Sequence, residues 1–205
     1  MDEFMEAINF RHACRLFDPE RGIPDALFGK IIEAGRLAPS SLGLQPWHFV
    51  AVADGKVKSA LRAGCGDQRQ VTECSRFVIL LARKPHHFEP GSPYLADIFH
   101  RNGMPPEKIN FIELRLASGR AEILQWAKTQ TYVAGTQMMM AAAFLGLDSC
   151  PVMGNPAEIA GTISEFVPAF DMDEFEVVWN IAFGYRAGEQ LPRVRLPVEE
   201  IATFV

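Results

Sequence analysis

This chain of 205 residues lacks the features that would mark it as a membrane protein or a disulfide-rich one. No apolar run reaches the roughly 20 residues that a helix needs to cross a bilayer. The longest such run, residues 133–147, is interrupted by Thr136 and Gln137. The cysteines are few, and their spacing matches no zinc or redox motif. We therefore expect no membrane span, and four free thiols in the core: Cys14, Cys65, Cys74 and Cys150.

Basic residues are also scarce. The chain has 20 lysines and arginines against 25 acidic residues, for a formal charge of −5. Nucleic-acid binders usually present a strongly basic face, so we expect no nucleic-acid partner. Residues 1–4 lack the basic and apolar regions of a signal peptide, and we expect a cytoplasmic protein.

A hydrophobic content of 48% predicts a large core, and no repeat or linker divides residues 1–205 into separate domains. Apolar periodicity predicts helices and strands that alternate irregularly, which leaves the class open between α/β and α+β. The continuous apolar run at residues 77–81 is typical of a strand covered on both faces. The expected helices are 2–9, 24–37, 55–63, 107–117, 120–145 and 156–166, and the expected strands are 47–53, 76–83, 149–152 and 176–183.

Two of these segments carry further information. Residues 120–145 form the longest expected helix, which is apolar all round near residues 138–143 and so belongs to the core or to a subunit interface. Residues 84–106 are rich in proline, and we expect an irregular excursion there with one short helix at 94–101. The tail beyond Gly188 is also expected to be irregular.

Arginines gather near both ends of the chain, at Arg11, Arg15, Arg193 and Arg195. The planar guanidinium offers a fork of donors that suits a phosphate. A fold that brings the two ends together would therefore build one anion pocket, suited to a phosphorylated cofactor rather than to a polyanion. The alternative is that each arginine is a solvated surface charge.

Four motifs occur in order along nearly the whole chain. They are Arg-His-Ala-Cys-Arg-Leu-Phe at 11–17, Ala-Pro-Ser-Ser at 38–41 followed by Gln-Pro-Trp-His-Phe at 45–49, Gly-Leu-Asp-Ser-Cys-Pro-Val at 146–152 with Gly154, and Gly-Tyr-Arg at 184–186 with Arg-Val-Arg-Leu-Pro at 193–197. Together they resemble the FMN-dependent nitroreductase family.

The resemblance implies an α+β fold with a central, mainly antiparallel sheet flanked by helices. It also implies a homodimer with a long core helix at its interface and FMN sites shared between the subunits. NADH or NADPH would reduce the flavin, and ping-pong hydride transfer through flavin N5 would reduce nitroaromatics, quinones or related small-molecule acceptors. Because the cofactor performs that chemistry, no side chain is expected to be a nucleophile or an obligatory acid.

The resemblance also implies roles for residues of this chain. Arg11 and Arg195 would hold the phosphate with Arg193 beside them, and Arg15 would raise the flavin potential from near N1 and O2. Gln68 and Gln70 would reach the uracil-like edge of the ring, or else lie in an exposed loop. The expected cofactor-binding set is Arg11, His12, Ala13, Arg15, Pro39, Ser40, Ser41, Gly43, Gln68, Gln70, Pro151, Val152, Met153, Gly154, Arg193 and Arg195.

Within this set, residues 39–41 would contact flavin from the other subunit, although a turn after a helix needs the same residue types. Residues 151–154 would lie over one face of the ring near N5. Three positions depart from the family pattern, each by loss of a polar side chain: Met153 stands where many relatives have Glu, Ala13 where Ser is common, and Gly43 where Asn is frequent.

Residues 85–117 are expected to cap the active site and shape its specificity. Phe88, Tyr94, Phe99 and Phe111 would either stack on a planar acceptor or pack the excursion onto the core. His86 and His87, with Glu89, are read as exposed residues, so no metal is expected.

Two alternatives to a nitroreductase-like activity stay open. One is a flavin enzyme of the same fold with another reaction, such as enone reduction or dehydrogenation. The other is a flavin-binding protein without catalysis.

Overall fold

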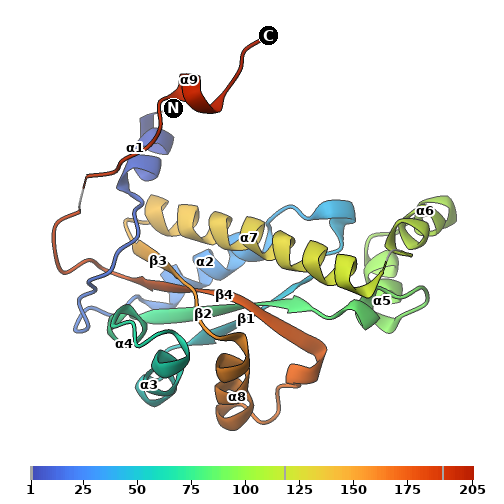
Figure 1. Cartoon of the computed structure of the whole chain (residues 1–205), viewed down its shortest axis with the longest axis horizontal. Helices are drawn as coiled ribbons and strands as arrows, with labels where there is room; N and C mark the ends of the chain where they lie inside the picture. The colour runs from blue at the N-terminus through green and yellow to red at the C-terminus, as the bar shows by residue number, and fades with distance from the viewer. Residues whose placement is uncertain (1, 118, 191) are drawn as a thin grey trace.

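The computed structural model describes residues 2–117, 119–190 and 192–205 (Figure 1). Four strands form one sheet: β1 (Trp47–Val52), β2 (Arg76–Arg83), β3 (Asp148–Val152) and β4 (Phe175–Gly184). The helices are α1 (Asp2–Phe10), α2 (Asp25–Arg36), α3 (Gly55–Gly64), α4 (Gln70–Glu73), α5 (Pro93–Arg101), α6 (Pro106–Leu116), α7 (Arg120–Phe144), α8 (Pro156–Phe166) and α9 (Val198–Ile201). Short 3₁₀ turns lie at η1 (Ser41–Gly43), η2 (Pro85–Phe88) and η3 (Met172–Glu174).

The sheet has the order β1-β2-β4-β3, and each neighbouring pair is antiparallel. The expected α+β architecture is therefore confirmed. Side chains of the central strand β2 alternate between the two faces, as the two-residue repeat of a strand requires. Phe77, Ile79 and Leu81 join one cluster, and Val78 and Leu80 join another. All five are fully buried, which confirms the prediction of a strand covered on both faces.

The two clusters correspond to two helical layers (Figure 1). Helices α3 and α8 cover one face of the sheet, and α2 and α7 cover the other. The long helix α7 comes close to the sheet at Gly135, where Trp179 and Leu80 occupy the space that a side chain would fill. It ends at Gly146, whose φ of +69° suits glycine. The N–H of Leu147 then donates to the carbonyl of Ala142 at 2.8 Å and closes the helix end.

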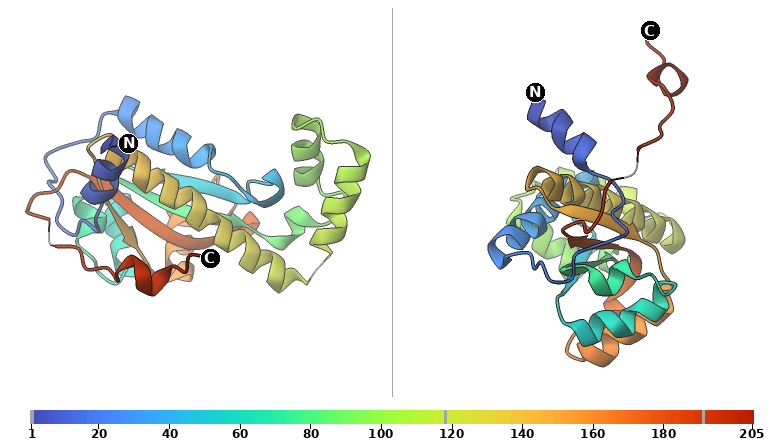
Figure 2. Two further views of the ribbon diagram at one scale, coloured as in Figure 1. Left: turned by 90° about the horizontal axis from the view of Figure 1, so that it is seen from above. Right: turned by 90° about the vertical axis from the view of Figure 1, so that its left-hand side faces the viewer.

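Residues 85–117 form η2, α5 and α6, which lie at one end of the molecule against the first turns of α7 (Figure 2). Phe88 and Phe99 are buried in a cluster that α7 completes with Ile123 and Ala127. These two rings therefore pack the excursion onto the core. Phe111, in contrast, is 55% exposed.

Both ends of the chain extend from the body near the last turn of α7 (Figures 1 and 2). In α1, the ring of Phe4 lies 6.2 Å from that of Phe144. The expected irregular tail is wrong at Val198–Ile201, which forms the short helix α9. Within the described residues, the helices are all too short or too polar to cross a membrane.

Candidate functional site

The segment after α1 runs along the β3 edge of the sheet as an extended strip. Ala13 pairs with Ser149 of β3, and the N–H of Cys14 donates to the Ser149 carbonyl at 3.0 Å. Cys14 and Phe17 are buried beneath the strip, whereas Ala13 and Arg15 are exposed. Successive side chains of an extended segment point to opposite sides. The buried Cys14 therefore aims its two neighbours, Ala13 and Arg15, outward.

A second wall comes from residues 186–190 and 192–195, which follow β4. Arg193 donates from Nη2 to the carbonyls of Ile8 at 2.8 Å and Asn9 at 3.0 Å, and also to that of Arg11. The last turn of a helix leaves such carbonyls without partners, and a cation suits that end of its dipole. Arg193 thus fastens the C-terminal segment to the end of α1. The fold therefore brings residues near the two ends of the chain together, as an anion pocket built from both would require.

These two walls and Pro151 enclose a cavity of about 900 Å³, the arginine cavity, lined by Arg11, Arg15, Arg193 and Arg195. Burial lowers the pKa of Arg11, and the charges of Arg193 and Arg195 lower it further. The side chains of Arg11 and Arg15 make no hydrogen bond or ion pair with the residues that the structure describes. Because Arg11 and Arg15 line the same cavity with unused guanidinium donors, the cavity fits a compact anion such as a phosphate.

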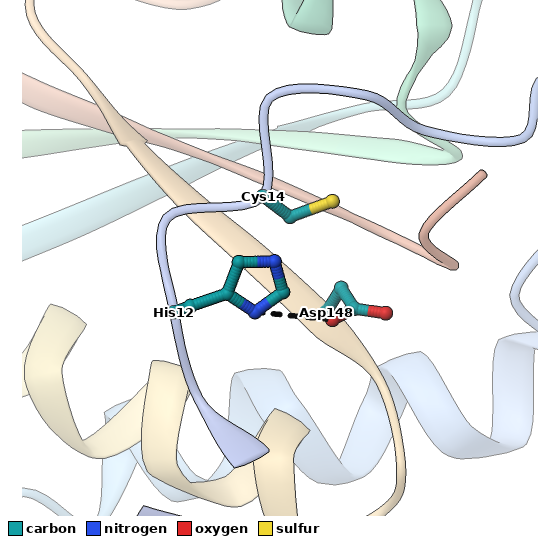
Figure 3. Close-up of side chains that lie close together, drawn as sticks. All are labelled: His12, Cys14 and Asp148. Carbon is teal, nitrogen blue, oxygen red and sulfur yellow. Dashed lines mark ion pairs between the residues drawn. The ribbon is translucent and has the colours of Figure 1, made fainter. Parts of the chain in front are cut away.

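A buried carboxylate supports the cavity from beneath. Asp148, 4% exposed, lies 2.7 Å from Arg186 Nη2 and accepts the Arg186 N–H at 2.9 Å. Figure 3 shows the His12 ring pointing at Asp148 from the neighbouring segment, with Nδ1 3.7 Å from the carboxylate. Burial lowers the pKa of His12, so the imidazole is neutral at pH 7. Arg186 therefore balances the charge of Asp148, and the pair fixes β3, the end of β4 and the first motif together.

Sequence reasoning assigned no role to Asp148 or Arg186. Both lie inside the motifs, and the available signal was a single charged residue in the otherwise uncharged segment 146–152. Such a residue needs a cationic partner once it is buried. The partner lies 38 residues further along the chain.

Gln68 and Gln70 lie beside the end of β3, and their amides already bind the protein. Gln68 Nε2 donates to the carbonyls of Cys65 at 2.7 Å and Met153 at 3.3 Å. Gln70 Nε2 donates to Gln68 Oε1 at 2.6 Å. Gln70 is 6% exposed, so it does not lie in an open loop. Of the pair, Gln70 keeps one amide N–H and its oxygen for a further ligand.

Residues 151–154, which form the end of β3 and the two positions after it, divide between core and surface. Val152 is fully buried, so it can offer a ligand only its backbone, whereas Pro151 and Met153 are exposed. A Cβ on Gly154 would lie 2.6 Å from the Gly64 carbonyl and 2.8 Å from Ile159 Cδ1. This glycine is therefore required for packing against α3, whatever the site binds.

The predicted flavin-binding residues in and just before η1 lie away from the arginine cavity. The Ser41 N–H donates to Gln130 Oε1 of α7 at 2.8 Å, and Ser41 and Gly43 line two cavities other than the arginine cavity. From Gln130 to Phe144, where α1 packs, α7 rises by about 20 Å at ~1.5 Å per residue. The structure does not bring Pro39, Ser40, Ser41 and Gly43 to the arginine cavity of the same chain.

The structure is thus an α+β fold in which segments near the two chain ends meet around a cavity lined by four arginines. The model of the nitroreductase family matches residues 8–185, a span that contains the first wall of the arginine cavity and Pro151 but not the lining residues from Arg186 onward. The chain belongs to the nitroreductase family.

Sequence relatives match along nearly the full length. A protein of Staphylococcus haemolyticus, provisionally named an NAD(P)H nitroreductase, is 36% identical, and the match covers 100% of this chain and 98% of that protein. YfkO of Bacillus subtilis, with the same provisional name, is 34% identical over 99% of this chain and 97% of its own.

Solved structures show the same fold. A Staphylococcus epidermidis protein, provisionally described as an NAD(P)H:FMN oxidoreductase, superposes with a TM-score of 0.82 at 25% identity, covering 100% of this chain and 97% of that one. A provisionally named nitroreductase of Exiguobacterium sibiricum, solved in complex with FMN, superposes with a TM-score of 0.80 at 22% identity, covering 98% and 97%.

Proposed function

We propose that this protein is an FMN-dependent oxidoreductase that uses NADH or NADPH to reduce nitroaromatics, quinones or related small molecules. The arginine cavity carries the proposal, because its unused guanidinium donors match the phosphate of a mononucleotide. Membership of the nitroreductase family supports it, as do the names of the relatives.

In this proposal Arg11, Arg15 and Arg195 bind the phosphate and the adjoining polar part of FMN. Arg193 contributes its charge, although carbonyl groups at the end of α1 occupy its Nη2. The ring would lie toward Pro151 and Met153. Gln70, whose second amide N–H and oxygen have no hydrogen-bond partner among the described residues, would bind its polar edge. When bound, FMN supplies the two-electron chemistry, taking hydride from the nicotinamide and passing electrons to the acceptor in a ping-pong cycle.

The protein side chains of the cavity are suited to binding rather than to acid, base or nucleophilic chemistry. Burial raises the pKa of Cys14 and Cys150 to about 11, so both stay thiols at neutral pH. His12 is neutral, and Asp148 is paired with Arg186. This inertness is consistent with a site in which the cofactor carries the reaction.

We further propose a homodimer with shared sites. One chain alone holds the arginine cavity near the last turn of α7, whereas Ser41 contacts Gln130 in the middle of that helix. A second copy would bring its own η1 to the cavity of the first. The exposed apolar residues of α1 and the tail, including Phe4, Ile201 and Phe204, are consistent with such an association.

An absorbance spectrum of the purified protein, recorded before and after anaerobic addition of NADH or NADPH, tests the proposal. We expect flavin bands that bleach with at least one donor. Flavin bands that persist with both donors would favour a binding protein without turnover. No flavin binding by folded protein, even after incubation with FMN, would refute the proposal.

A panel of nitroaromatics, quinones and enones then separates the proposed activity from enone reduction. For the shared site, flavin retention is measured as the protein is diluted through its dimer–monomer transition. We expect flavin to be released with dissociation. A monomer that retains FMN at undiminished affinity would contradict the shared site.

A further inference from the structure

Two adjacent histidines at the start of the excursion converge on a glutamate from the far end of the chain. His86 Nε2 lies 3.0 Å and His87 Nε2 lies 2.8 Å from the same atom, Oε2 of Glu174. One ligand atom from each of the three residues falls within 4.8 Å of the others. The sequence interpretation grouped these histidines with Glu89, but Glu89 lies 2.6 Å from Arg120 instead. The convergence therefore depends on the contact between η2 and η3, which the sequence does not show.

The histidine nitrogens are incompletely satisfied by the protein. His87 Nε2 is shielded from solvent, and its position beside Glu174 does not give a hydrogen bond with any residue in the described part of the chain. Two imidazole nitrogens and a carboxylate oxygen form a ligand set that suits Zn²⁺ and neighbouring transition metals.

The surrounding structure holds the three groups in place. The N–H of Lys84 donates to the backbone carbonyl of Glu174 at 3.1 Å, which joins the start of η2 to the end of η3. The rings of His86 and His87 lie 4.3 Å apart, and His87 packs edge-on against Tyr94 at 5.6 Å. His86 and Glu174 are each about two-fifths exposed. Solvent can therefore reach the site and complete the coordination of an ion.

The local charges also permit a cation. Arg83 is the closest opposing charge, but its guanidinium carbon lies over the faces of Tyr94 at 4.2 Å and Phe175 at 5.0 Å. Lys128 is also positively charged, but Glu176 lies 2.9 Å from its Nζ and offsets that charge. Glu174 carries its negative charge at the point where both nitrogens meet.

A second cluster of possible ligands differs in this respect. His12, Cys14 and Asp148 also lie close together, but Arg186 already binds the carboxylate and the arginine cavity lies alongside. A divalent cation there would face several guanidinium groups. The cluster of His12, Cys14 and Asp148 therefore has surroundings that disfavour a cation, in contrast to those of His86, His87 and Glu174.

We propose that His86, His87 and Glu174 form a binding site for a divalent transition metal of the Zn²⁺ class. The ion would tie the start of residues 85–117 to the start of β4 and so stabilise the base of the excursion. This inference does not depend on the proposed cofactor or activity.

Calorimetric titration of the untagged full-length protein with ZnCl₂ tests the site. We expect one ion per chain at concentrations up to about 100 µM, and a rise in the unfolding temperature, because a ligand that binds only the folded state stabilises it. The variants His87→Gln and Glu174→Gln should lose both effects. The matched variant Glu89→Gln, which alters a neighbouring surface acid, should keep them.

Two outcomes would overturn the proposal: no binding by the native protein, or unchanged binding by His87→Gln. A CoCl₂ spectrum supplies a second readout. We expect weak visible bands from nitrogen and oxygen ligands. A strong thiolate-to-cobalt band that disappears in Cys14→Ser would instead assign binding to the other cluster. Unfolding of each variant without metal shows whether it is folded.

Discussion

Replacing Gly135 with alanine should destabilise this protein, although alanine is the better helix former. An added Cβ would meet Trp179 Cζ2, would lie 2.7 Å from its Cη2 and would lie 2.9 Å from Leu80 Cδ2. Both partners are buried between α7 and the sheet and have little room to move. Glycine to alanine in a helix interior contributes about 1 kcal/mol, whereas overpacking costs typically 1–3 kcal/mol. Because this contact is far below van der Waals distance, we expect an overpacking cost near the upper end of that range, about 3 kcal/mol. After the gain of about 1 kcal/mol in helix propensity, the net loss is about 2 kcal/mol.

Urea unfolding at a fixed protein concentration, followed by far-ultraviolet circular dichroism, measures the effect without relying on the fluorescence of Trp179. Gly161→Ala in α8 and Gly29→Ala in α2 are matched controls, since an added Cβ there has no neighbour within 4 Å. The controls should gain up to about 1 kcal/mol. If Gly135→Ala is as stable as they are, the close approach of α7 to the sheet is wrong.

Three further predictions concern the site and its surroundings. Arg195→Ala should weaken FMN binding about tenfold or more, because a charge-assisted bond to phosphate is worth about 1.5–3 kcal/mol. A fluorescence titration with FMN measures this, with Arg101→Ala as the control. Equal affinities of the two variants would refute the assignment of Arg195. Asp148→Asn should lower the free energy of unfolding by about 3 kcal/mol, since Arg186 loses its buried partner, and unchanged urea unfolding would show that the pair contributes nothing. Burial raises the pKa of the four thiols above the usual 9.0, so the folded state keeps protons that the unfolded chain releases, and the free energy of unfolding should fall as pH rises beyond 9 toward 11. Native thiols should also react with iodoacetamide at pH 8 far more slowly than the thiols of the unfolded chain. Equal reaction rates would contradict their burial. These thiols are Cys14, Cys65 and Cys150, each with a pKa of about 11, and Cys74, with a pKa of about 12.

The regular elements with strong apolar patterns could be predicted from the sequence. The strand predicted at residues 76–83 has the same bounds in the structure, and the predicted helix 120–145 is one residue shorter as Arg120–Phe144. The short helices α4 and α9 have only four residues each, too few to show a helical repeat. Their formation depends on local hydrogen bonds and contacts that composition does not reveal.

The residue types of the candidate site could be predicted from the sequence, but not which of these residues lie together and which are buried or already paired. Motif order indicated that Arg11 and Arg195 belong together, and the structure places both on one cavity. The sequence could not show that the Gln68 amide holds the Met153 carbonyl, or that the Val152 side chain lies in the core. The partners of Asp148 and His87 lie far along the chain, and only tertiary structure brings them near. A contact between two residues so far apart leaves no recognisable pattern in the sequence around either of them.

The fastening of Arg193 to the carbonyl of Ile8 joins residues 185 positions apart. Closing so long a segment requires the intervening sheet and helices to be in place, since an unfolded chain rarely brings such distant residues together. During synthesis the arginine cavity can therefore be completed only after almost the whole chain has left the ribosome. A prematurely ended chain that still formed the sheet would lack one wall of the cavity, so retention of an anion would report that the chain is complete.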